Sequence, residues 1–240
     1  MPHRQKNEKD EIKREYDMER PSRITASDGI FDILRRQILS LTLPPGEELN
    51  INFLAGELGV SRSPVRDALI KLSRDKLVDV FPQKGTRVAL LDVERVEDER
   101  FMRRSMEEAA VKIFAASHHE DDMAILRHAI ALQMKAMEKE DYLAFLESDD
   151  AFHYQVFNAI GRSWCWDVIS TLCGNHHRIR LLSFRLEGVL GDIVAQHERM
   201  MDAFGRRDVD ESCRLENSHL SKLTDETVVL RKKFPNYFIV

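Results

Sequence analysis

Several features of secreted and membrane proteins are missing from this chain of 240 residues. It has three cysteines, Cys165, Cys173 and Cys213, and no CxxC pair, which argues against a disulfide framework. We expect Cys165 and Cys173, which fall in apolar sequence, to be buried reduced thiols. No run of about 18 uncharged apolar residues occurs, so no membrane span is predicted. The charged N-terminus lacks the apolar stretch of a secretory signal, which predicts a cytoplasmic protein.

The negative charge of the chain is unevenly distributed. The formal net charge is −5, yet residues 1–27 and residues 28–90 each carry a net charge of +1, and residues 91–240 carry −7. The acidity therefore belongs to the C-terminal part, and the N-terminal part does not repel a polyanion such as DNA. The position of individual arginines must then decide whether DNA binds there.

Composition and periodicity divide the chain into three parts. Residues 1–27 are a polar tail of mixed charge without apolar periodicity, which we expect to be disordered. Residues 28–90 combine short helical patterns with β-prone runs, and residues 91–240 are helical throughout. The expected fold class is mostly α: a small N-terminal domain of mixed structure, followed by an all-α helical bundle.

Residues 28–90 contain helix, helix, tight turn, helix and hairpin in that order. A helical pattern that starts at Gly29 includes Leu41 and is ended by 44–46, the sequence PPG. A second helix is predicted over 52–58. Gly59 suits the left-handed turn before a third helix, which begins near Ser61. Two β-prone runs, 77–81 and 86–89, flank a glycine turn and predict a hairpin. This is the order of a winged helix-turn-helix.

After Asp92 the sequence shows no strand-like alternation, and short polar separators divide it into helices. Such a pattern predicts a bundle whose neighbouring helices pack against one another. The helices are expected at about 92–117, 121–139, 141–160, 164–186, 189–205 and 208–233.

The segment PGEELNINFLAGELGVSRSPVRDALIKLSRDKLV, followed by PQKGTRV, resembles the DNA-binding domain of the GntR family of bacterial regulators. The later motifs DDAFHYQVF, QHERMMDAF and ENSHL are similar to the all-helical effector domain of the FadR subfamily. The resemblance covers nearly all of the chain after residue 29. It implies a transcription regulator in which residues 28–90 bind operator DNA, while residues 91–240 bind an effector and a metal and form a homodimer.

The start of the third helix carries arginines that suit DNA. A guanidinium can bind O6 and N7 of guanine together in the major groove, and a helix N-terminus favours a nearby phosphate. The resemblance implies that Arg62 and Arg66 are the main contacts, assisted by Ser63. It also places Asn52 where a side chain can contact the DNA backbone, although a role in starting the second helix is an equal alternative.

The resemblance places Lys84 and Gly85 at the wing tip, close to the minor groove of DNA. Glycine there lets the backbone take a positive φ and approach DNA closely. For Lys84 a solvated loop charge is the alternative. The chain departs from the family pattern at Lys76, which stands where glycine is common. Lys76 must therefore adopt a strained helix-end conformation, unless the turn is built differently.

Four residues of the C-terminal part could bind a metal. Asp149 and His153 are four positions apart, so a helix places both on one face. With His197 and His219 from later helices, they offer one carboxylate and three imidazoles, a set that suits zinc, nickel, iron or manganese. From the residues alone, ordinary core or surface histidines explain such a set more often. The resemblance implies that all four are metal ligands.

Arg103 and Glu107 have the spacing of a helix-stabilising ion pair. The resemblance instead places Arg103 in the ligand pocket, where a guanidinium binds a carboxylate through two hydrogen bonds. A metal with open positions beside an arginine would suit a small organic acid as effector. His176 and His177 could also line the pocket. The histidines outside the metal set are expected at the surface or in the core: His118, His119, His128, His176 and His177.

We therefore expect a sequence-specific DNA-binding transcription regulator, a repressor that leaves its operator when a small carboxylate binds beside the metal. Ligand-dependent activation is the opposite possibility. In a second alternative the chain is a metalloregulator and the metal itself is the signal. A metal-dependent hydrolase is a third, but neither an HExxH motif nor a glycine-rich phosphate loop occurs, so no enzyme is expected.

Overall fold

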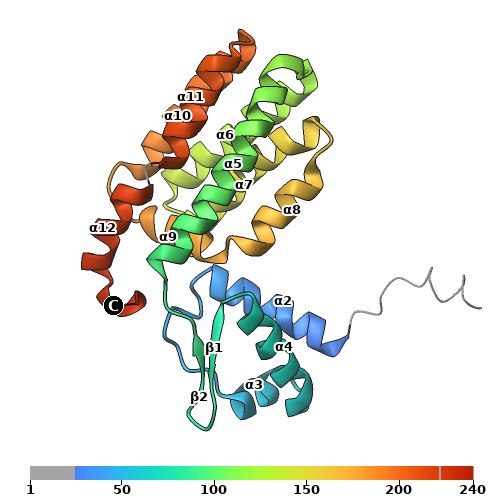
Figure 1. Cartoon of the computed structure of the whole chain (residues 1–240), viewed down its shortest axis with the longest axis vertical. Helices are drawn as coiled ribbons and strands as arrows, with labels where there is room; N and C mark the ends of the chain where they lie inside the picture. The colour runs from blue at the N-terminus through green and yellow to red at the C-terminus, as the bar shows by residue number, and fades with distance from the viewer. Residues whose placement is uncertain (1–24, 222, 240) are drawn as a thin grey trace, which may run out of the picture.

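The computed structural model describes residues 25–221 and 223–239. Figure 1 shows a small domain with a hairpin at one end of the long axis and a bundle of helices at the other. Most of the described residues are helical, which confirms the expected mostly α fold class. The predicted disorder of the tail falls on residues 1–24, which lie outside the described residues.

The small domain is a winged helix-turn-helix. It consists of three helices and an antiparallel hairpin: α2 (Ala26–Leu39), α3 (Ile51–Glu57), α4 (Arg62–Arg74), β1 (Val78–Phe81) and β2 (Gly85–Val88). The apolar stripes of α2 and α4 close on a common core, in which Leu34, Val65 and Leu72 are buried. In the hairpin, Val78 pairs with Val88, and both side chains face this core.

The bounds of α2 differ from those expected at both ends. At its start, the hydroxyl of Thr25 accepts from the amide of Asp28, and the carboxylate of Asp28 accepts from the amide of Thr25. This capping box starts the helix at Ala26, so residues 26 and 27 are helical and do not belong to the tail. At its end, Leu41 has a φ of 60°, which is incompatible with the right-handed helix that the sequence pattern suggested there.

The turn between α3 and α4 has the conformation that the sequence predicted. Gly59 has a φ of 64°, and Ser61 is the N-cap of α4, although its side chain makes no capping hydrogen bond. Lys76, which follows α4 where the family often has glycine, also takes the left-handed conformation, with a φ of 58°. A side chain other than glycine in this region costs about 1 kcal/mol or more, so the fold tolerates local strain here.

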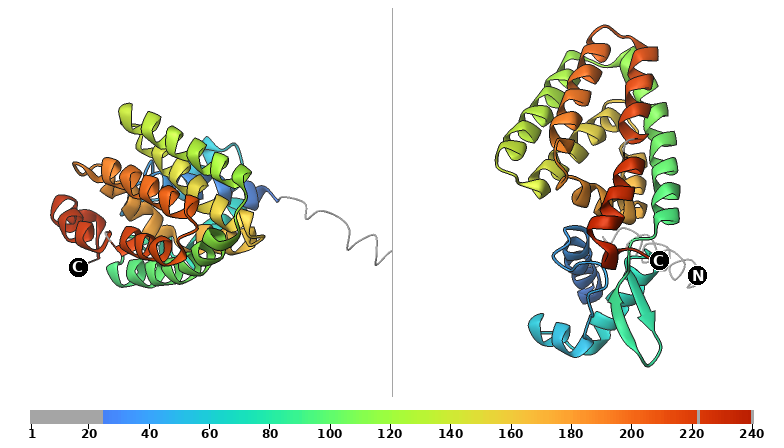
Figure 2. Two further views of the ribbon diagram at one scale, coloured as in Figure 1. Left: turned by 90° about the horizontal axis from the view of Figure 1, so that it is seen from above. Right: turned by 90° about the vertical axis from the view of Figure 1, so that its left-hand side faces the viewer.

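The C-terminal part is a bundle of helices, shown from two further directions in Figure 2. Its core is one large apolar cluster to which α5, α6, α7 and α10 contribute fully buried aromatic or aliphatic side chains. The bounds of these helices are α5 (Val93–Ser117), α6 (Glu120–Glu138), α7 (Tyr142–Ala159), α8 (Ser163–Leu172), α9 (Gly174–Ser183), α10 (Val189–Gly205), α11 (Val209–Ser221) and α12 (Leu223–Lys233).

The prediction of a single helix over 164–186 is wrong. The chain bends at Cys173, where φ and ψ are −92° and 42°, and α9 begins at the next residue. The bend brings Gly174 against the small domain, where a Cβ on Gly174 would lie 2.8 Å from Cδ2 of Leu77. The helix expected over 208–233 is described as α11 and α12, on either side of residue 222, which lies outside the described residues.

A third apolar cluster joins the two parts at the linker between β2 and α5. Leu91 in this linker packs with Ile179 and Leu182 of α9 and with Leu230 of α12. Beyond α12 comes a short 3-10 helix, Pro235–Tyr237, after which Phe238 forms a parallel bridge with Leu91. Figure 2 shows this last segment beside the linker. The linker is therefore held by α9 and by the end of the chain.

Two further features of the described residues are the burial of the cysteines and the apolar character of the helices. Cys173 is buried, as expected, whereas Cys165 and Cys213 are only partly buried, and all three are free thiols. Among the described residues, no helix combines the length and the apolar character that crossing a membrane requires.

Candidate nucleic-acid interface and metal centre

The N-terminal part of α4 exposes the side chains predicted to contact DNA. Arg62, Ser63 and Arg66 are all exposed, while Val65 and Ala68 on the other face are buried in the domain core. The helix is thus anchored on one face and free on the other, which is what insertion into a major groove requires. The structure brings these three predicted residues together on one solvent-facing surface.

Asn52 lies in the first turn of α3, but it does not start this helix. Asn50 is the N-cap of α3, and its Oδ1 accepts from the amides of Asn52 and Phe53, at 2.9 and 3.2 Å. The alternative role of Asn52 as a helix starter is therefore wrong. Its side chain is exposed, as a contact to the DNA backbone would need.

The wing tip carries Lys84 and Gly85, both exposed. Gly85 has a φ of 110°, a region that is essentially restricted to glycine, so this position requires the residue it has. Gln83, before the tip, also has a positive φ of 62°. Arg87 on β2 lies over the ring of Phe81, with its guanidinium carbon 4.7 Å from the ring centroid, which is a cation–π contact within the wing.

The four predicted metal ligands converge in the bundle. Asp149 and His153 come from α7, His197 from α10 and His219 from α11. One donor atom from each lies within 4.8 Å of those from all the others. Nε2 of His197 lies 3.7 Å from Oδ1 of Asp149, and Nε2 of His153 lies 3.8 Å from Oδ2 of the same carboxylate. Three chain segments distant in sequence thus supply one compact donor set.

The remaining ring nitrogen of each histidine is held from outside the cluster. Nδ1 of His197 lies 2.9 Å from Oε1 of Gln133, and Nδ1 of His219 lies 2.8 Å from Oε1 of Gln196. Both contacts favour the tautomer with a proton on Nδ1, which leaves Nε2 as a lone-pair donor that faces the cluster. Partners of this kind orient the ligands of metal sites.

Three atoms inside the cluster have no hydrogen-bond partner among the described residues: Oδ1 of Asp149 and Nε2 of His153 and of His197. Buried polar atoms without partners are costly, because they lose water and gain nothing in return. The fact that the unpartnered atoms all point to one place is the observation that fits a bound cation. The donor types, one carboxylate oxygen and imidazole nitrogens, are those of transition-metal sites.

The electrostatics of the cluster keep its donors in the form that binds a metal. Burial lowers the pKa of His197 to about 3 and also lowers the pKa of His219, so both imidazoles are neutral at pH 7. Burial alone would raise the pKa of Asp149. The guanidinium of Arg180, and in acid the protonated histidines, outweigh this effect and hold its pKa below the ordinary value.

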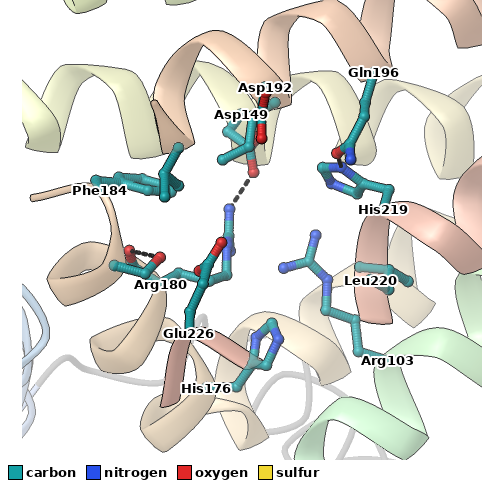
Figure 3. A pocket seen from close by; sticks show the side chains of 13 residues that line it. Arg103, Asp149, His176, Arg180, Phe184, Asp192, Gln196, His219, Leu220 and Glu226 are labelled. Atoms are coloured by element: carbon teal, nitrogen blue, oxygen red, sulfur yellow. Dashed lines mark hydrogen bonds and ion pairs between the residues drawn. The ribbon is translucent and has the colours of Figure 1, made fainter. Parts of the chain in front are cut away.

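A pocket opens beside the cluster, with a volume of about 50 Å³. Figure 3 shows the guanidinium of Arg103 pointing toward His219, and Arg180 paired with Asp149 on the other side. Arg103 and Glu107 form the ion pair that their spacing predicted, and both are buried. Nη2 of Arg103 nevertheless has no partner among the described residues, so this arginine makes the helix pair and also lines the pocket.

The histidines outside the metal set differ in burial. His176 is buried and lines the pocket, a possibility that the sequence left open. His177 is partly buried, and its Nδ1 lies 3.8 Å from Oδ2 of Asp150. His118 is buried, and His119 and His128 are exposed.

Several residues that hold the candidate ligands received no such role from the sequence. Gln133, Gln196 and Glu107 contact the imidazoles, and Arg180 pairs with Asp149. The sequence offered Glu107 only as a partner of Arg103, and Gln196 only as part of the motif QHERMMDAF. A cation such as Arg180 beside Asp149 could have been expected, because a buried carboxylate needs a cation. Glu107, His153 and Glu216 form a second group of possible metal ligands, whose donor atoms lie within 4.8 Å of one another. Burial and then Glu107 raise the pKa of Glu216 well above its ordinary value.

The fold and the exposed face of α4 define a class: winged helix-turn-helix DNA-binding regulators with an attached helical domain. Comparison with family models gives two matches, "Bacterial regulatory proteins, gntR family" over residues 26–88 and "FCD domain" over residues 100–222. The chain belongs to the GntR family of bacterial transcriptional regulators, in the branch whose C-terminal domain is the FadR-type FCD domain. This confirms the resemblance seen in the sequence.

Individual relatives agree with this assignment. The chain is 32% identical over 85% of its length to an uncharacterized HTH-type transcriptional regulator in an unstable DNA locus of Streptomyces ambofaciens, 86% of which is covered. It is 29% identical over 87% of its length to the HTH-type transcriptional repressor RspR of Escherichia coli, 92% of which is covered.

A solved structure with the same fold is a GntR transcriptional regulator from Rhodococcus sp. RHA1. Its TM-score is 0.72 at 21% identity, covering 85% of this chain and 97% of that one. Escherichia coli McbR/YncC has a TM-score of 0.71 at 18% identity, covering 88% and 99%. The matching families and relatives are transcriptional regulators and not enzymes, so the chain is a DNA-binding regulator and not a hydrolase.

Proposed function

We propose that the chain is a cytoplasmic, homodimeric repressor whose affinity for its operator is controlled by a small carboxylate bound beside a divalent transition metal. One observation carries the proposal: the unpartnered donor atoms of Asp149, His153 and His197 converge on one point inside the bundle. An apolar core would pack there at lower cost, so the chain retains these donors for a ligand.

Asp149, His153, His197 and His219 would hold the metal. Zinc, nickel, iron and manganese all accept such donors, and the surrounding side chains do not select among them. The bound ion would supply positive charge and Lewis acidity beside the pocket. The neutral state of the buried imidazoles at pH 7 supports this role, because metal and proton compete for the same lone pair.

Arg103 would bind the carboxylate of the effector. Its Nη2 has no partner among the described residues, while its Nε is bound by Glu107, so the side chain is fixed with one donor edge toward the pocket. Charge-assisted hydrogen bonds to carboxylates are among the stronger ones in proteins. The small pocket volume of about 50 Å³ favours a short organic acid over a long acyl chain.

Two observations support the repressor and dimer assignments. The relative RspR, similar over most of both chains, is named a transcriptional repressor. Phe101 on α5 and Trp164 on α8 are 65% and 74% exposed, and large aromatic side chains at a surface are typical of protein interfaces. Two copies joined through the bundle would present two α4 helices to the two halves of a palindromic operator. Lys84 and Gly85 would reach the minor groove beside each half.

The proposal is tested by release of DNA. Operator fragments are first recovered with the purified chain from sheared DNA of the source organism, and binding is then followed by fluorescence anisotropy. We expect the zinc-loaded chain to leave the fragment when one member of a panel of acetate, lactate, succinate and citrate is added. Arg103→Lys, which keeps the charge and loses the planar fork, should require a higher concentration of that acid, and Arg104→Lys serves as the matched control.

The same assay separates the carboxylate sensor from the metalloregulator. If chelation and re-addition of zinc switch DNA binding without any carboxylate, the metal is the signal and the role given to Arg103 is wrong. If no member of the panel changes the affinity of the metal-loaded chain, the carboxylate part of the proposal fails.

A further inference from the structure

Helix α9 lies between the pocket and the DNA-binding domain and presents different residues to each. His176, Arg180 and Ser183 line the pocket, at spacings that place them on one face of the helix. Gly174 and Arg178 are each offset by two positions from this stripe. Two positions correspond to about 200° of rotation, so they lie on the opposite face. That face contacts the DNA-binding domain and the linker after it.

Arg178 forms the hydrogen bond that links α9 to this linker. Its Nη1 donates to the backbone oxygen of Ala89, just after β2, at 2.7 Å, and its Nη2 donates to Oδ1 of Asn175 at 2.7 Å. The side chain is completely buried, and burial lowers its pKa to about 10. A buried guanidinium is expensive unless its donors are paired, and an apolar residue would fill this junction at less cost.

Glu99 of α5 continues the same buried network. Its carboxylate accepts from Nδ2 of Asn175 at 3.0 Å, from the amide of His176 at 2.9 Å and from Nε of Arg95 at 2.9 Å. The amide of His176 belongs to the first turn of α9, where an anion is favoured by the helix dipole. The network thus fixes the N-terminal end of α9 and the position of Arg178 together.

The face of α9 that carries His176 and Arg180 contacts the candidate metal centre. Arg180 donates to the carboxylate of Asp149, a proposed metal ligand, and its Nη1 donates to Oδ1 of Asp150 at 2.7 Å. A shift of Asp149 or of a ligand in the pocket therefore acts directly on this helix. Packed helices move as units and do not deform continuously, so the shift reaches Arg178 as well.

We propose that Arg178 is a positioning residue that couples the pocket to the DNA-binding domain, by holding α9 to the backbone of Ala89. The inference rests on the proposed function in taking the pocket as the regulatory site. It adds the route by which occupancy of that site reaches α4: through α9, Arg178 and the linker. Coupling energies of this kind typically change an affinity by about 5- to 150-fold.

Arg35 provides a matched control. It also crosses between the domains and also donates to backbone oxygens, those of Ser170 at 2.6 Å and Thr171 at 3.4 Å. These two acceptors lie on α8, which contributes no residue to the lining described for the pocket. Removing Arg35 should weaken docking of the domains while it leaves the hydrogen bonds of Arg178 and Arg180 on α9 in place.

Hydrogen–deuterium exchange of the full chain tests the route, with zinc alone as the probe and peptides covering 77–92 as the readout. We expect saturating zinc to slow exchange there by about fivefold or more in the wild type and in Arg35→Met. In Arg178→Met, zinc should bind with unchanged stoichiometry but leave exchange in 77–92 unaltered, and Arg178→Lys should restore part of the response. An equal response in Arg178→Met and wild type, or an equal loss in Arg35→Met, would overturn the inference.

A second arm does not depend on any metal. Arg180→Met removes the contact between α9 and Asp149, and it should change exchange in 77–92 in the wild-type background. In the Arg178→Met background the same substitution should have no further effect, because the link is already cut. Additive effects of the two substitutions would contradict the coupling even in a chain that binds no zinc, and they would leave the metal proposal to be judged separately.

Discussion

Oε2 of Glu107 lies 2.6 Å from Nδ1 of His153, and both side chains are almost completely buried. The same carboxylate also accepts from Arg103, the proposed contact for the effector. The other two histidines of the cluster have neutral glutamine oxygens at Nδ1. His153 is therefore the imidazole with an anionic partner, and a carboxylate at this position makes an imidazole a stronger metal ligand.

Glu107→Gln should weaken zinc binding by about 10- to 100-fold while leaving all four ligands in place. The reason is that an amide keeps the shape of the contact but removes its charge. Competition against a chromophoric chelator measures the affinity. Glu108→Gln, at the exposed neighbouring position, is the control, and an equal zinc affinity for both variants would show that Glu107 does not support the site.

Arg66→Ala should weaken operator binding by about 1–3 kcal/mol, which is roughly 5- to 150-fold, because a bidentate contact to a base is lost. The measurement is anisotropy at one fixed salt concentration, since phosphate contacts make affinity depend on salt. Arg74→Ala, exposed at the far end of the same helix, should change affinity little. The assignment of the contact face fails if Arg74→Ala has the larger effect.

The metal-free chain should lose stability on acidification, and the sign follows from His197. Its pKa is lowered from 6.5 to about 3 in the folded chain by burial, so the unfolded chain binds the extra proton first. The stabilisation is present above pH 6.5 and is lost as the pH falls toward 3. Linkage gives about 2 kcal/mol between pH 7 and pH 5 from this residue. Urea unfolding at both pH values checks it; in His197→Gln the difference should shrink by about that amount.

Gly174→Ala should destabilise the junction between the domains by about 1–3 kcal/mol, because the new Cβ would lie 2.8 Å from Cδ2 of buried Leu77. Gly191→Ala, in α10 with nothing within 4 Å of its Cβ position, should instead stabilise the helix by up to about 1 kcal/mol. Thermal unfolding of the two variants compares them. A neutral Gly174→Ala would show that this contact is not tight in solution.

The fold could be predicted from the sequence because local patterns and family motifs agreed. Helical spacing, proline and glycine positions, and the hairpin pattern each indicated the same order of elements, and the structure has that order. The expected helix over 164–186 failed for a tertiary reason. Apolar spacing continues through the bend at Cys173, whereas the packing of Gly174 against Leu77 of the small domain, just after the bend, is a long-range contact.

The sequence predicted which four candidate ligands lie together, but not the residues that hold them in place. Asp149 and His153 share a helix face, and the motifs around His197 and His219 belong to the resemblance, so the linear sequence was enough to propose the set. Gln133, Gln196 and Arg180 act only through packing of helices distant in sequence, which periodicity does not show. The positions of Arg178 and Glu99 at the junction depend on the same long-range packing.

The central claim is that Asp149, His153, His197 and His219 hold a metal, and the metal content of the purified chain tests it most directly. Elemental analysis, together with non-denaturing mass spectrometry, should find about one divalent metal per chain in the wild type and in the control His128→Ala, and little in His197→Ala. No metal in the wild type after incubation with zinc, nickel and manganese, or full occupancy in His197→Ala, would contradict the account.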